Sequence, residues 1–249
     1  MPHSDAPSPG LPAILPGQVH LWWATLECSD AETSQWATLL DAQELDRARA
    51  FQFEVHRSQF LAAHGKLRTL LGWYLGQHPS NVSFSISPRG KPSVPSAGIA
   101  FNLSHSGDRM LVAISAGQEL GVDLERMRSI GSSSESESLA REIMHVNELE
   151  HWLSLPPEHR QAEFFRIWTA KEAVLKSTGQ GIAGGLTHFA LPPTGELDLQ
   201  TDGQQRAPIS IQPVAVSDGF AAALATVGAR PRIVLYRFPE DFPATTAQP

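Results

Sequence analysis

Two long segments with helical periodicity, each flanked by short strand-like runs, constrain the fold of this 249-residue chain most strongly. In Val55–Gly76 and Glu163–Ser177, apolar residues recur at the spacing that places them on one face of a helix. Strand candidates surround both segments, so each half of the chain consists of strands around helices. We therefore predict an α+β (α/β) fold, a pseudo-twofold pair of similar halves, each a small antiparallel sheet packed with helices. No short sequence repeat is visible, so the duplication would be structural only.

The expected elements divide the chain near Glu119. Residues 1–17 and 240–249 are expected to be a flexible arm and tail, 18–118 the N-terminal half, and 119–239 the C-terminal half. Further helices are expected at Ser34–Phe53 and Leu139–Leu153, and Gly179 and Gly181 end the helix that precedes them. A serine- and glutamate-rich stretch is expected to be a mobile loop, Ser129–Ser138. The predicted strands are Val19–Leu26, Val82–Ile86, Ile99–Leu103, Met110–Ser115, Leu120–Leu124, Phe189–Leu191, Ile209–Pro213, Phe220–Thr226 and Ile233–Phe238.

Composition excludes several classes of protein. The single cysteine, Cys28, rules out an internal disulfide and is typical of a reducing compartment. No apolar run approaches the roughly 18–20 residues of a membrane span, and the proline-rich N-terminus lacks the layout of a secretory signal. The net charge of −7 argues against general nucleic-acid binding. We expect a cytoplasmic monomer with no membrane or nucleic-acid partner.

The charge is nevertheless unevenly distributed along the chain. The stretch from Arg47 to Lys91 contains one acid, Glu54, and carries a net charge of +6, which leaves −13 on the rest of the chain. A basic patch on an acidic protein suits a small polyanionic ligand, although a solvated basic helix face would give the same count. The basic residues of this stretch are Arg47, Arg49, Arg57, Lys66, Arg68, Arg89 and Lys91.

Two acidic residues share one face of a predicted strand. In the run Gly121–Glu125, alternate side chains point the same way, so Asp123 and Glu125 lie together while Val122 and Leu124 face the core. Two adjacent carboxylates repel each other, and a divalent cation removes that cost. Oxygen ligands without cysteine favour magnesium or calcium. The alternative is a solvent-facing edge strand with two unrelated acids.

The segment Glu163–Ser177 carries charged residues in unusual places. Glu172 and Lys176 are four residues apart on one flank, a spacing typical of a surface ion pair. Lys171 instead projects near the middle of the apolar stripe, where an unpaired ammonium group would be costly. It requires a carboxylate partner or an anionic ligand, or it extends along the helix to reach water.

The run Phe101–Gly107 ends a strand in a tight turn. Its neighbouring residues Ser104 and His105 point to opposite faces of a strand, so they do not form a nucleophile–base pair. A hydroxyl, an imidazole and the backbone N–H groups of a turn can instead bind phosphate, whereas a lone histidine more often has a structural role. The chain contains no phosphate-binding loop of the G-x-x-x-x-G-K-[ST] type, no strand-linked G-x-G-x-x-G and no G-x-S-x-G elbow.

The order of three sequence blocks is more specific than any single one. FNLSHSG at 101–107, GVDLE at 121–125 and FFRIWTAKEAVLK at 164–176 closely resemble the signature blocks of the surfactin-synthetase-activating type of 4′-phosphopantetheinyl transferase. The upstream GKP at Gly90–Pro92 and the preceding basic helix are also similar to that family. The resemblance extends over roughly Arg47 to Ile182.

The resemblance implies an active site between two similar halves, with coenzyme A as co-substrate and Mg²⁺ as cofactor. The enzyme would convert an apo acyl- or peptidyl-carrier protein to its holo form and release 3′,5′-ADP. Asp123, Glu125 and Glu172 match the magnesium ligands, and Glu172, Lys176 and Asp123 would be catalytic. The implied coenzyme A contacts are Arg47, Arg57, Lys91, Ser104, His105 and Lys176. Glu44 occupies a position that is basic in some relatives, which places that part of the nucleotide pocket in question.

Two other classes of function remain open at this point. One is a different magnesium-dependent phosphotransferase or nucleotide hydrolase that uses the same carboxylates. The other is a non-catalytic module that binds coenzyme A or a carrier protein. The intact set of Asp123, Glu125, Glu172 and Lys176 argues against the second class, because a decayed site usually loses a carboxylate.

Overall fold

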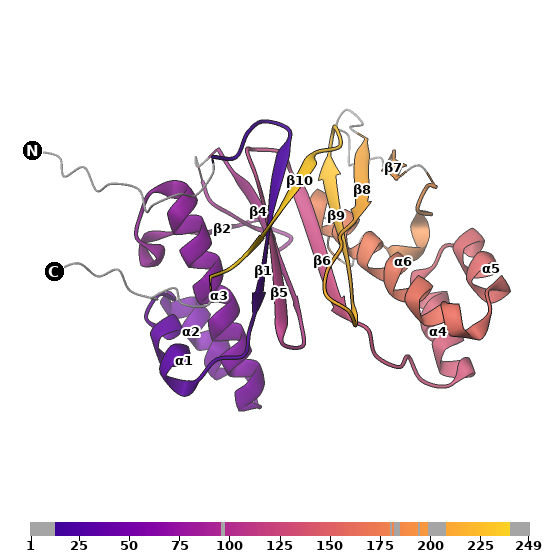
Figure 1. Ribbon diagram of the computed structural model, residues 1–249, viewed down its shortest axis with the longest axis horizontal. Helices are drawn as coiled ribbons and strands as arrows, with labels where there is room; N and C mark the ends of the chain where they lie inside the picture. Colours follow the sequence, from indigo (N-terminus) through magenta and orange to yellow (C-terminus); the bar gives the residue numbers. More distant parts are fainter. Residues whose placement is uncertain are drawn as a thin grey trace, which may run out of the picture.

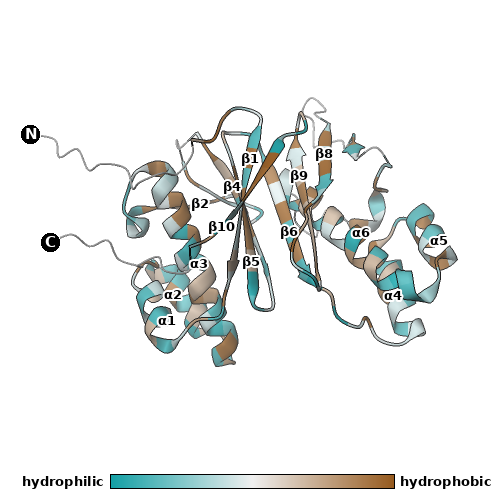
Figure 2. Ribbon diagram, in the orientation of Figure 1, coloured by the Kyte–Doolittle hydropathy of each residue, from teal (hydrophilic) through white to brown (hydrophobic). Residues whose placement is uncertain are grey.

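Four layers make up the molecule: helices, sheet, sheet, helices (Figure 1). The computed structural model describes residues 13–95, 98–179, 181, 185–193, 195–198 and 208–239. Most of the predicted flexible arm, 1–12, and the predicted tail, 240–249, lie outside these residues. Apolar segments concentrate in the two central sheets and the inner faces of the helices (Figure 2). No described helix is apolar enough over its length to cross a membrane.

The first sheet has the strand order β10-β1-β5-β4. Its strands are β1 (Gln18–Thr25), β4 (Ala100–Ser106), β5 (Arg109–Ser115) and β10 (Arg232–Arg237). β1, β5 and β4 pair antiparallel, whereas β10 pairs parallel to β1. The helices α1 (Asp30–Ala37), α2 (Ala42–Arg49) and α3 (Glu54–Leu75) cover its outer face. A short hairpin joins β2 (Ser85–Ile86) to β3 (Pro92–Ser93).

The second sheet has the order β6-β9-β8-β7 and is antiparallel throughout. It contains β6 (Leu120–Arg126), β7 (Glu196–Leu197), β8 (Ile209–Pro213) and β9 (Phe220–Val227). Its outer face is covered by α6 (Pro157–Thr178), with α4 (Ser133–Ile143) and α5 (Val146–Ser154) packed beyond it. The predicted pair of similar halves, each a sheet with helices, is therefore confirmed.

Strict alternation along the strands explains why the two sheets pack face to face. On β5, Met110, Val112 and Ile114 face the helices of the first half, while Leu111 and Ala113 face the second sheet. These residues pack against an apolar face of the second sheet, made of Leu120, Val122, Leu124, Ala222 and Leu224. Because a strand presents successive side chains to opposite faces, each sheet supplies two cores at once.

Several predicted boundaries were wrong. The single helix expected at Ser34–Phe53 is two helices, because Asp41 caps the start of α2 by accepting from the backbone N–H of Glu44 at 2.9 Å. The stretch Ser129–Ser138, expected to be a loop, contains the first turns of α4. There the Glu135 carboxylate accepts from the backbone N–H of Ser132 at 2.8 Å, which starts the helix.

Other corrections concern the strands and the ends of the halves. Only Ser85–Ile86 of the strand expected at Val82–Ile86 is extended and paired. Phe189–Leu191 forms no strand, because its backbone groups bond to buried side chains instead of to a neighbouring strand. The helix expected at Leu139–Leu153 is divided between α4 and α5. β10, expected in the C-terminal half 119–239, pairs with β1 in the first sheet.

Candidate active site

The two halves meet where the edge strand β4 runs beside the edge strand β6. Backbone N–H groups of β6 do not pair with the backbone of β4 here; they bond to its side chains. The Asn102 Oδ1 accepts from the N–H of Val122 at 2.9 Å, and the hydroxyls of Ser104 and Ser106 accept from the next two outward-facing N–H groups at 3.2 and 3.1 Å. This seam brings the FNLSHSG block against the GVDLE block.

Asp123 lies at the centre of the seam and is 3% exposed. Its Oδ1 accepts from the Lys176 Nζ at 2.6 Å and from the Ser104 hydroxyl at 2.9 Å. The Lys176 Nζ also donates to the Ser104 Oγ at 3.2 Å. Three residues from the three signature blocks therefore form one hydrogen-bonded group, and the predicted convergence of these blocks is observed.

Helix α6 can approach β6 so closely because of Gly121. A Cβ atom added there would lie 2.2 Å from the carbonyl oxygen of Ala173 and 2.7 Å from the Cβ of Lys176. Any side chain at Gly121 would therefore push α6 away and separate Lys176 from Asp123. The glycine of the GVDLE block is as necessary to the geometry as its acids.

Glu125 follows Asp123 on the same face of β6, as predicted, and is half-buried. Its Oε2 accepts from the Ser106 hydroxyl at 2.7 Å, and its Oε1 accepts from the Trp168 Nε1–H at 3.3 Å. Val122 and Leu124 face the core between the sheets. The alternative of a solvent-facing edge strand with two unrelated acids is excluded.

Glu172 does not form the surface ion pair that its spacing from Lys176 suggested. It is 9% exposed, and Lys176 pairs with Asp123 instead. Burial, followed by the negative charge of Asp123, raises the pKa of Glu172, and Lys176 only partly offsets this effect. A buried carboxyl group beside another acid in this way is typical of functional sites rather than of surface ion pairs.

Two carboxylate oxygens at this site have no hydrogen-bond partner among the described residues: the Oδ2 of Asp123 and the Oε1 of Glu172. Buried polar atoms normally have partners, and oxygens of this kind are the ligands that Mg²⁺ prefers. The donor chemistry of Asp123, Glu125 and Glu172 thus fits a magnesium ion. In the described part of the chain, however, no three histidine, cysteine or acidic side chains are arranged as a metal site, so the magnesium assignment stays a prediction.

Ser104 and His105 lie on opposite faces of β4, as predicted. Ser104 is buried in the seam, whereas His105 is exposed on the side that faces the helices of the first half. Protein packed around one side of the imidazole, followed by the charges of His64 and Lys176, lowers the pKa of His105. The structure thus leaves the predicted phosphate contact of His105 a prediction.

Lys91 reaches from the first half to the second. Its Nζ donates to the Glu119 carboxylate at 2.6 Å and to the carbonyls of Leu120 and Ser177 at 3.2 and 3.1 Å. The GKP turn thus contacts the start of β6 and the end of α6. In this structure the ammonium group is neutralised by Glu119, so its predicted contact with coenzyme A remains a prediction.

The two predicted arginines lie on the helices of the first half. Arg57 is in the first turn of α3 and pairs with Glu54 at 2.8 Å, with no interaction with the seam among the described residues. The Arg47 guanidinium lies 5.3 Å above the ring of Phe60, which stacks on His64 at 4.0 Å. Both rings belong to α3, which covers the face of the first sheet on which His105 lies. Arg47 is therefore on the same side of β4 as His105.

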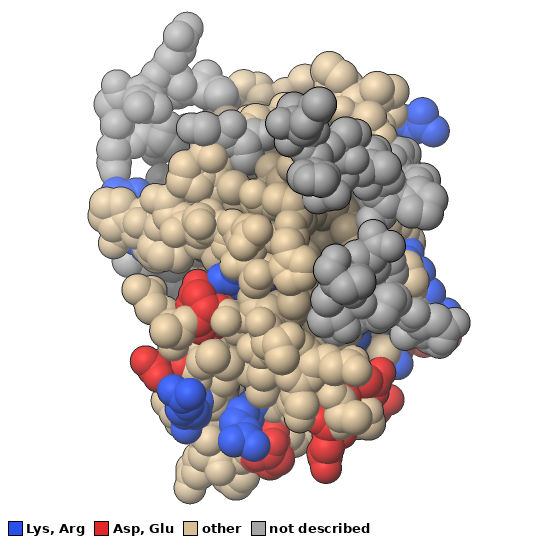
Figure 3. Space-filling view, turned by 90° about the vertical axis from the view of Figure 1, so that its left-hand side faces the viewer, with Lys and Arg blue, Asp and Glu red and all other residues tan. Residues whose placement is uncertain are grey.

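The predicted basic patch does not exist as one surface. Lys66 and Arg68 are buried: Lys66 donates to the carbonyl of Thr25 at 2.6 Å, and Arg68 pairs with Asp41 and Glu44 at 2.6 and 2.7 Å. On the uncovered part of the face that carries the first-half helices, basic and acidic side chains lie next to each other (Figure 3). The charge count along the sequence therefore overstated the positive surface.

Glu44 has a structural role. Burial opposes its ionisation, but the hydrogen bond from His64 at 2.8 Å and the charge of Arg68 outweigh this and lower the pKa of Glu44. It also closes the cap of α2 by accepting from the backbone N–H of Asp41 at 3.1 Å. The carboxylate at this position, which is basic in some relatives, thus holds Arg68 in the core.

Lys171 pairs with a carboxylate, as its position on the apolar stripe of α6 required. It is fully buried and pairs with Glu148 at 2.7 Å, while the carbonyls of Leu186 and Phe189 accept its other protons at 2.6 and 2.7 Å. It therefore does not extend to water, and it anchors the segment after α6.

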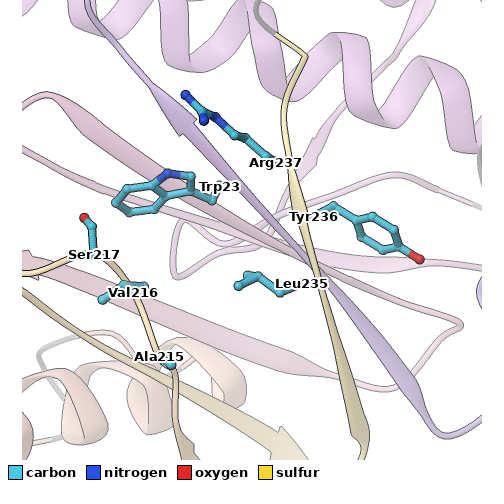
Figure 4. A pocket seen from close by; sticks show the side chains of 7 residues that line it. All are labelled: Trp23, Ala215, Val216, Ser217, Leu235, Tyr236 and Arg237. Carbon is cyan, nitrogen blue, oxygen red and sulfur yellow. The ribbon is translucent and has the colours of Figure 1, made fainter.

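A cavity of about 330 Å³ lies between β1, β10 and the segment Ala215–Ser217 (Figure 4). It opens at the β10 and β1 edge of the first sheet, whereas the seam is at the β4 edge. Leu235 reaches toward Val216 across it, and Tyr236 points away to the other side of β10. The cavity contains none of the predicted site residues.

Sequence reasoning missed two residues that contact the site carboxylates, Ser106 and Trp168, and the role of Asn102 in joining β4 to β6. Asn102 and Ser106 share a face with Ser104 at a spacing of two, which was visible in the FNLSHSG block. Trp168 fits the apolar periodicity of Glu163–Ser177, and nothing local indicates that its indole N–H faces a carboxylate.

Comparisons with known proteins agree with this geometry. The model of the 4′-phosphopantetheinyl transferase superfamily matches residues 119–225. The 4′-phosphopantetheinyl transferase HetI of Nostoc sp. is 40% identical over 232 residues, covering 91% of this chain and 94% of that protein. Psf-1 of Bacillus pumilus is 32% identical over 64% of this chain and 70% of its own length, and Sfp of Bacillus subtilis is 24% identical over 86% and 90%.

A solved holo-[acyl-carrier-protein] synthase of Thermotoga maritima matches more distantly. It is 19% identical, covers 45% of this chain and 64% of its own, and has a TM-score of 0.30. The identity to HetI over nearly the whole of both chains is the decisive finding. Together with the convergence of the three signature blocks at one seam, it shows that this chain belongs to the 4′-phosphopantetheinyl transferase superfamily.

Proposed function

We propose that this protein transfers the 4′-phosphopantetheine group of coenzyme A to a serine hydroxyl of an acyl- or peptidyl-carrier protein, at the seam between its two halves. The observation that carries the proposal is the group formed by Ser104, Asp123 and Lys176, beside the buried carboxyl group of Glu172. Anionic and cationic side chains held this closely are suited to a reaction in which charge moves between phosphate oxygens.

The reaction replaces the phosphoanhydride bond of coenzyme A by a phosphodiester bond to the carrier. The serine oxygen of the carrier bonds to the phosphorus that bears pantetheine, the bond from that phosphorus to the bridging oxygen breaks, and 3′,5′-ADP leaves with the electron pair. Positioning and charge stabilisation supply most of the catalysis in reactions of this type. The seam would need to hold the pyrophosphate and to accept the serine proton.

The residues of the seam divide these tasks. Asp123, Glu125 and Glu172 would hold a magnesium ion, which supplies positive charge to the pyrophosphate when bound. Glu172 would accept the serine proton, directly or through a water that it orients. Lys176 would meet the charge that develops on the leaving phosphate.

The remaining contacts would bind the rest of coenzyme A. His105 would contact a phosphate oxygen from the exposed face of β4, and Ser104 would release Asp123 to reach another. Arg47, held over the ring of Phe60, would bind the 3′-phosphate. Lys91 would bind the same phosphate after releasing Glu119. Arg57, in the first turn of α3, would add positive charge to the coenzyme A site once released from Glu54.

The test is to incubate the protein with coenzyme A, Mg²⁺ and a panel of apo-carriers, and to measure intact carrier mass and released 3′,5′-ADP. We expect one 3′,5′-ADP for each phosphopantetheine group added. Release of free phosphopantetheine without carrier modification, or turnover of ATP without a carrier, would assign the site to another phosphotransferase or hydrolase. Binding of coenzyme A with no chemistry toward any carrier would indicate a binding module.

A further inference from the structure

The hydroxyl of Ser106 makes two hydrogen bonds at once. It accepts from the backbone N–H of Arg126 at 3.1 Å and donates to the Oε2 of Glu125 at 2.7 Å. The other carboxylate oxygen of Glu125 accepts from the Trp168 Nε1–H at 3.3 Å. Each oxygen of this carboxylate therefore has one donor, and the two donors come from opposite sides, β4 and α6.

The neighbouring serine repeats this arrangement. Ser104 accepts from the backbone N–H of Leu124 at 3.2 Å and donates to the Oδ1 of Asp123 at 2.9 Å. Ser104 and Ser106 thus relate in the same way to two successive acids of one face of β6. The two serines on β4 therefore fix the distance between the carboxylate groups of Asp123 and Glu125. The backbone of β6 alone would not fix it, because the terminal torsion of a carboxylate side chain rotates easily.

We infer that Ser106 and Trp168 are positioning residues for Glu125, holding its carboxylate in the orientation in which it binds a divalent cation. Carboxylates that bind metals are usually oriented by outer hydrogen-bond donors, and removing such a donor costs about 10- to 100-fold in metal affinity. The inference rests on the proposed function, because it concerns the same carboxylate cluster. It adds two residues that touch neither substrate nor metal.

A purely structural role for Ser106 is the alternative, in which its hydroxyl only joins β4 to β6. Asn102 shows what that role is like, because its Oδ1 accepts from the N–H of Val122 at 2.9 Å and it bonds to no carboxylate among the described residues. Asn102→Ala therefore removes a contact between the strands and leaves Glu125 untouched. It is the matched control for Ser106→Ala.

Trp168→Phe isolates the second donor. Phenylalanine keeps an aromatic ring at the position where Trp168 stacks on Phe164, with ring planes 7° apart, but it lacks the N–H. Ser106→Thr is the conservative variant, because threonine keeps the hydroxyl and suits a strand. The two substitutions separate hydrogen bonding to Glu125 from packing and from pairing of the strands.

The experiment titrates Mn²⁺ alone into the full-length wild type and each variant by calorimetry, and measures the Mg²⁺ concentration for half-maximal transfer. Mn²⁺ serves as the probe because it takes the same oxygen ligands. Ser106→Ala should weaken Mn²⁺ binding and raise the half-maximal Mg²⁺ concentration by about tenfold. Trp168→Phe should do so less, because its bond is longer, and Ser106→Thr should behave as the wild type.

Asn102→Ala should lower the melting temperature and leave metal affinity unchanged. The inference is wrong if Ser106→Ala and Trp168→Phe keep both wild-type values, or if Asn102→Ala weakens metal binding equally. Should Ser106→Ala fail to fold, the Mn²⁺ affinity and half-maximal Mg²⁺ concentration of Trp168→Phe decide whether the inference holds. Failure of the proposed function would look different, because the wild type itself would then transfer nothing to any carrier.

Discussion

Helix α6 carries two lysines that each pair with a carboxylate, and the two environments differ. Lys171 is fully enclosed, and its three partners are Glu148 and two backbone carbonyls. Lys176 retains 28% side-chain exposure and pairs with Asp123 in a cluster that also contains Glu172. The two lysines are five residues apart on one helix and lie in different surroundings.

The difference lies in what remains unsatisfied. Around Lys171 the charges balance and the protons of the ammonium group have acceptors, which is how a protein tolerates a buried lysine. Around Lys176 one ammonium group faces Asp123, Glu125 and Glu172, and two carboxylate oxygens have no partner in the described residues. A closed cluster stabilises the fold, whereas an open one with surplus negative charge is ready to bind a cation or a ligand.

The largest effect should come from the open cluster. Asp123→Ala removes the residue that joins Lys176 to the seam, so transfer to apo-carrier should fall by about 10³-fold or more. Its melting temperature without metal should change little, because relief of the repulsion from Glu172 offsets the lost bonds to Lys176 and Ser104. Full activity of Asp123→Ala, or activity that EDTA does not reduce, would contradict the metal assignment.

Matched substitutions of the two lysines test the comparison itself. Lys171→Met leaves Glu148 buried and unpaired, so it should cost about 3–5 kcal/mol of unfolding free energy, with normal turnover per folded molecule. Lys176→Met should also destabilise the fold, because it leaves Asp123 buried and without its cation, but unlike Lys171→Met it should lower kcat about 100-fold. Steady-state kinetics of the folded variants therefore separates the two lysines. A normal kcat for Lys176→Met would show that Lys176 is structural.

A third cluster, around Glu44, extends the comparison to pH. The folded state lowers the pKa of Glu44 below its ordinary value of 4.5. The unfolded chain therefore binds more protons, and the stability contributed is present above that value and lost as pH falls through the folded pKa. Glu44→Gln should cost about 3 kcal/mol at pH 7, and the difference from wild type should shrink as acid is added. A difference that is constant with pH would contradict this ionic role.

The smallest effect concerns Lys91. Its ammonium group is paired, like that of Lys171, but its partner Glu119 is exposed and can be exchanged for a ligand. If Lys91 exchanges Glu119 for the 3′-phosphate, Lys91→Gln should weaken coenzyme A about tenfold and dephospho-coenzyme A much less. Equal losses for both ligands would place it on the pyrophosphate. Unchanged affinity for both would leave it as a link between the GKP turn and α6.

Sequence patterns predicted the halves, most strands and the acids of the site, because periods of two and of about 3.6 are local properties. They failed where a distant partner decides the structure. The segment Phe189–Leu191 looked like a strand, but Lys171 and Glu148 take its backbone hydrogen bonds. Lys66 and Arg68 looked like a surface patch, and only the packing of α3 against the first sheet shows that they are buried.

The most direct test of the account is the rate of holo-carrier formation by Glu172→Gln. This change keeps the shape of the side chain but removes the carboxyl group, whose pKa is raised by burial and by the charge of Asp123. The account predicts a collapse of transfer, near-native or higher stability, and continued binding of coenzyme A. Transfer at the wild-type rate by Glu172→Gln would contradict the assignment of the active site to this seam.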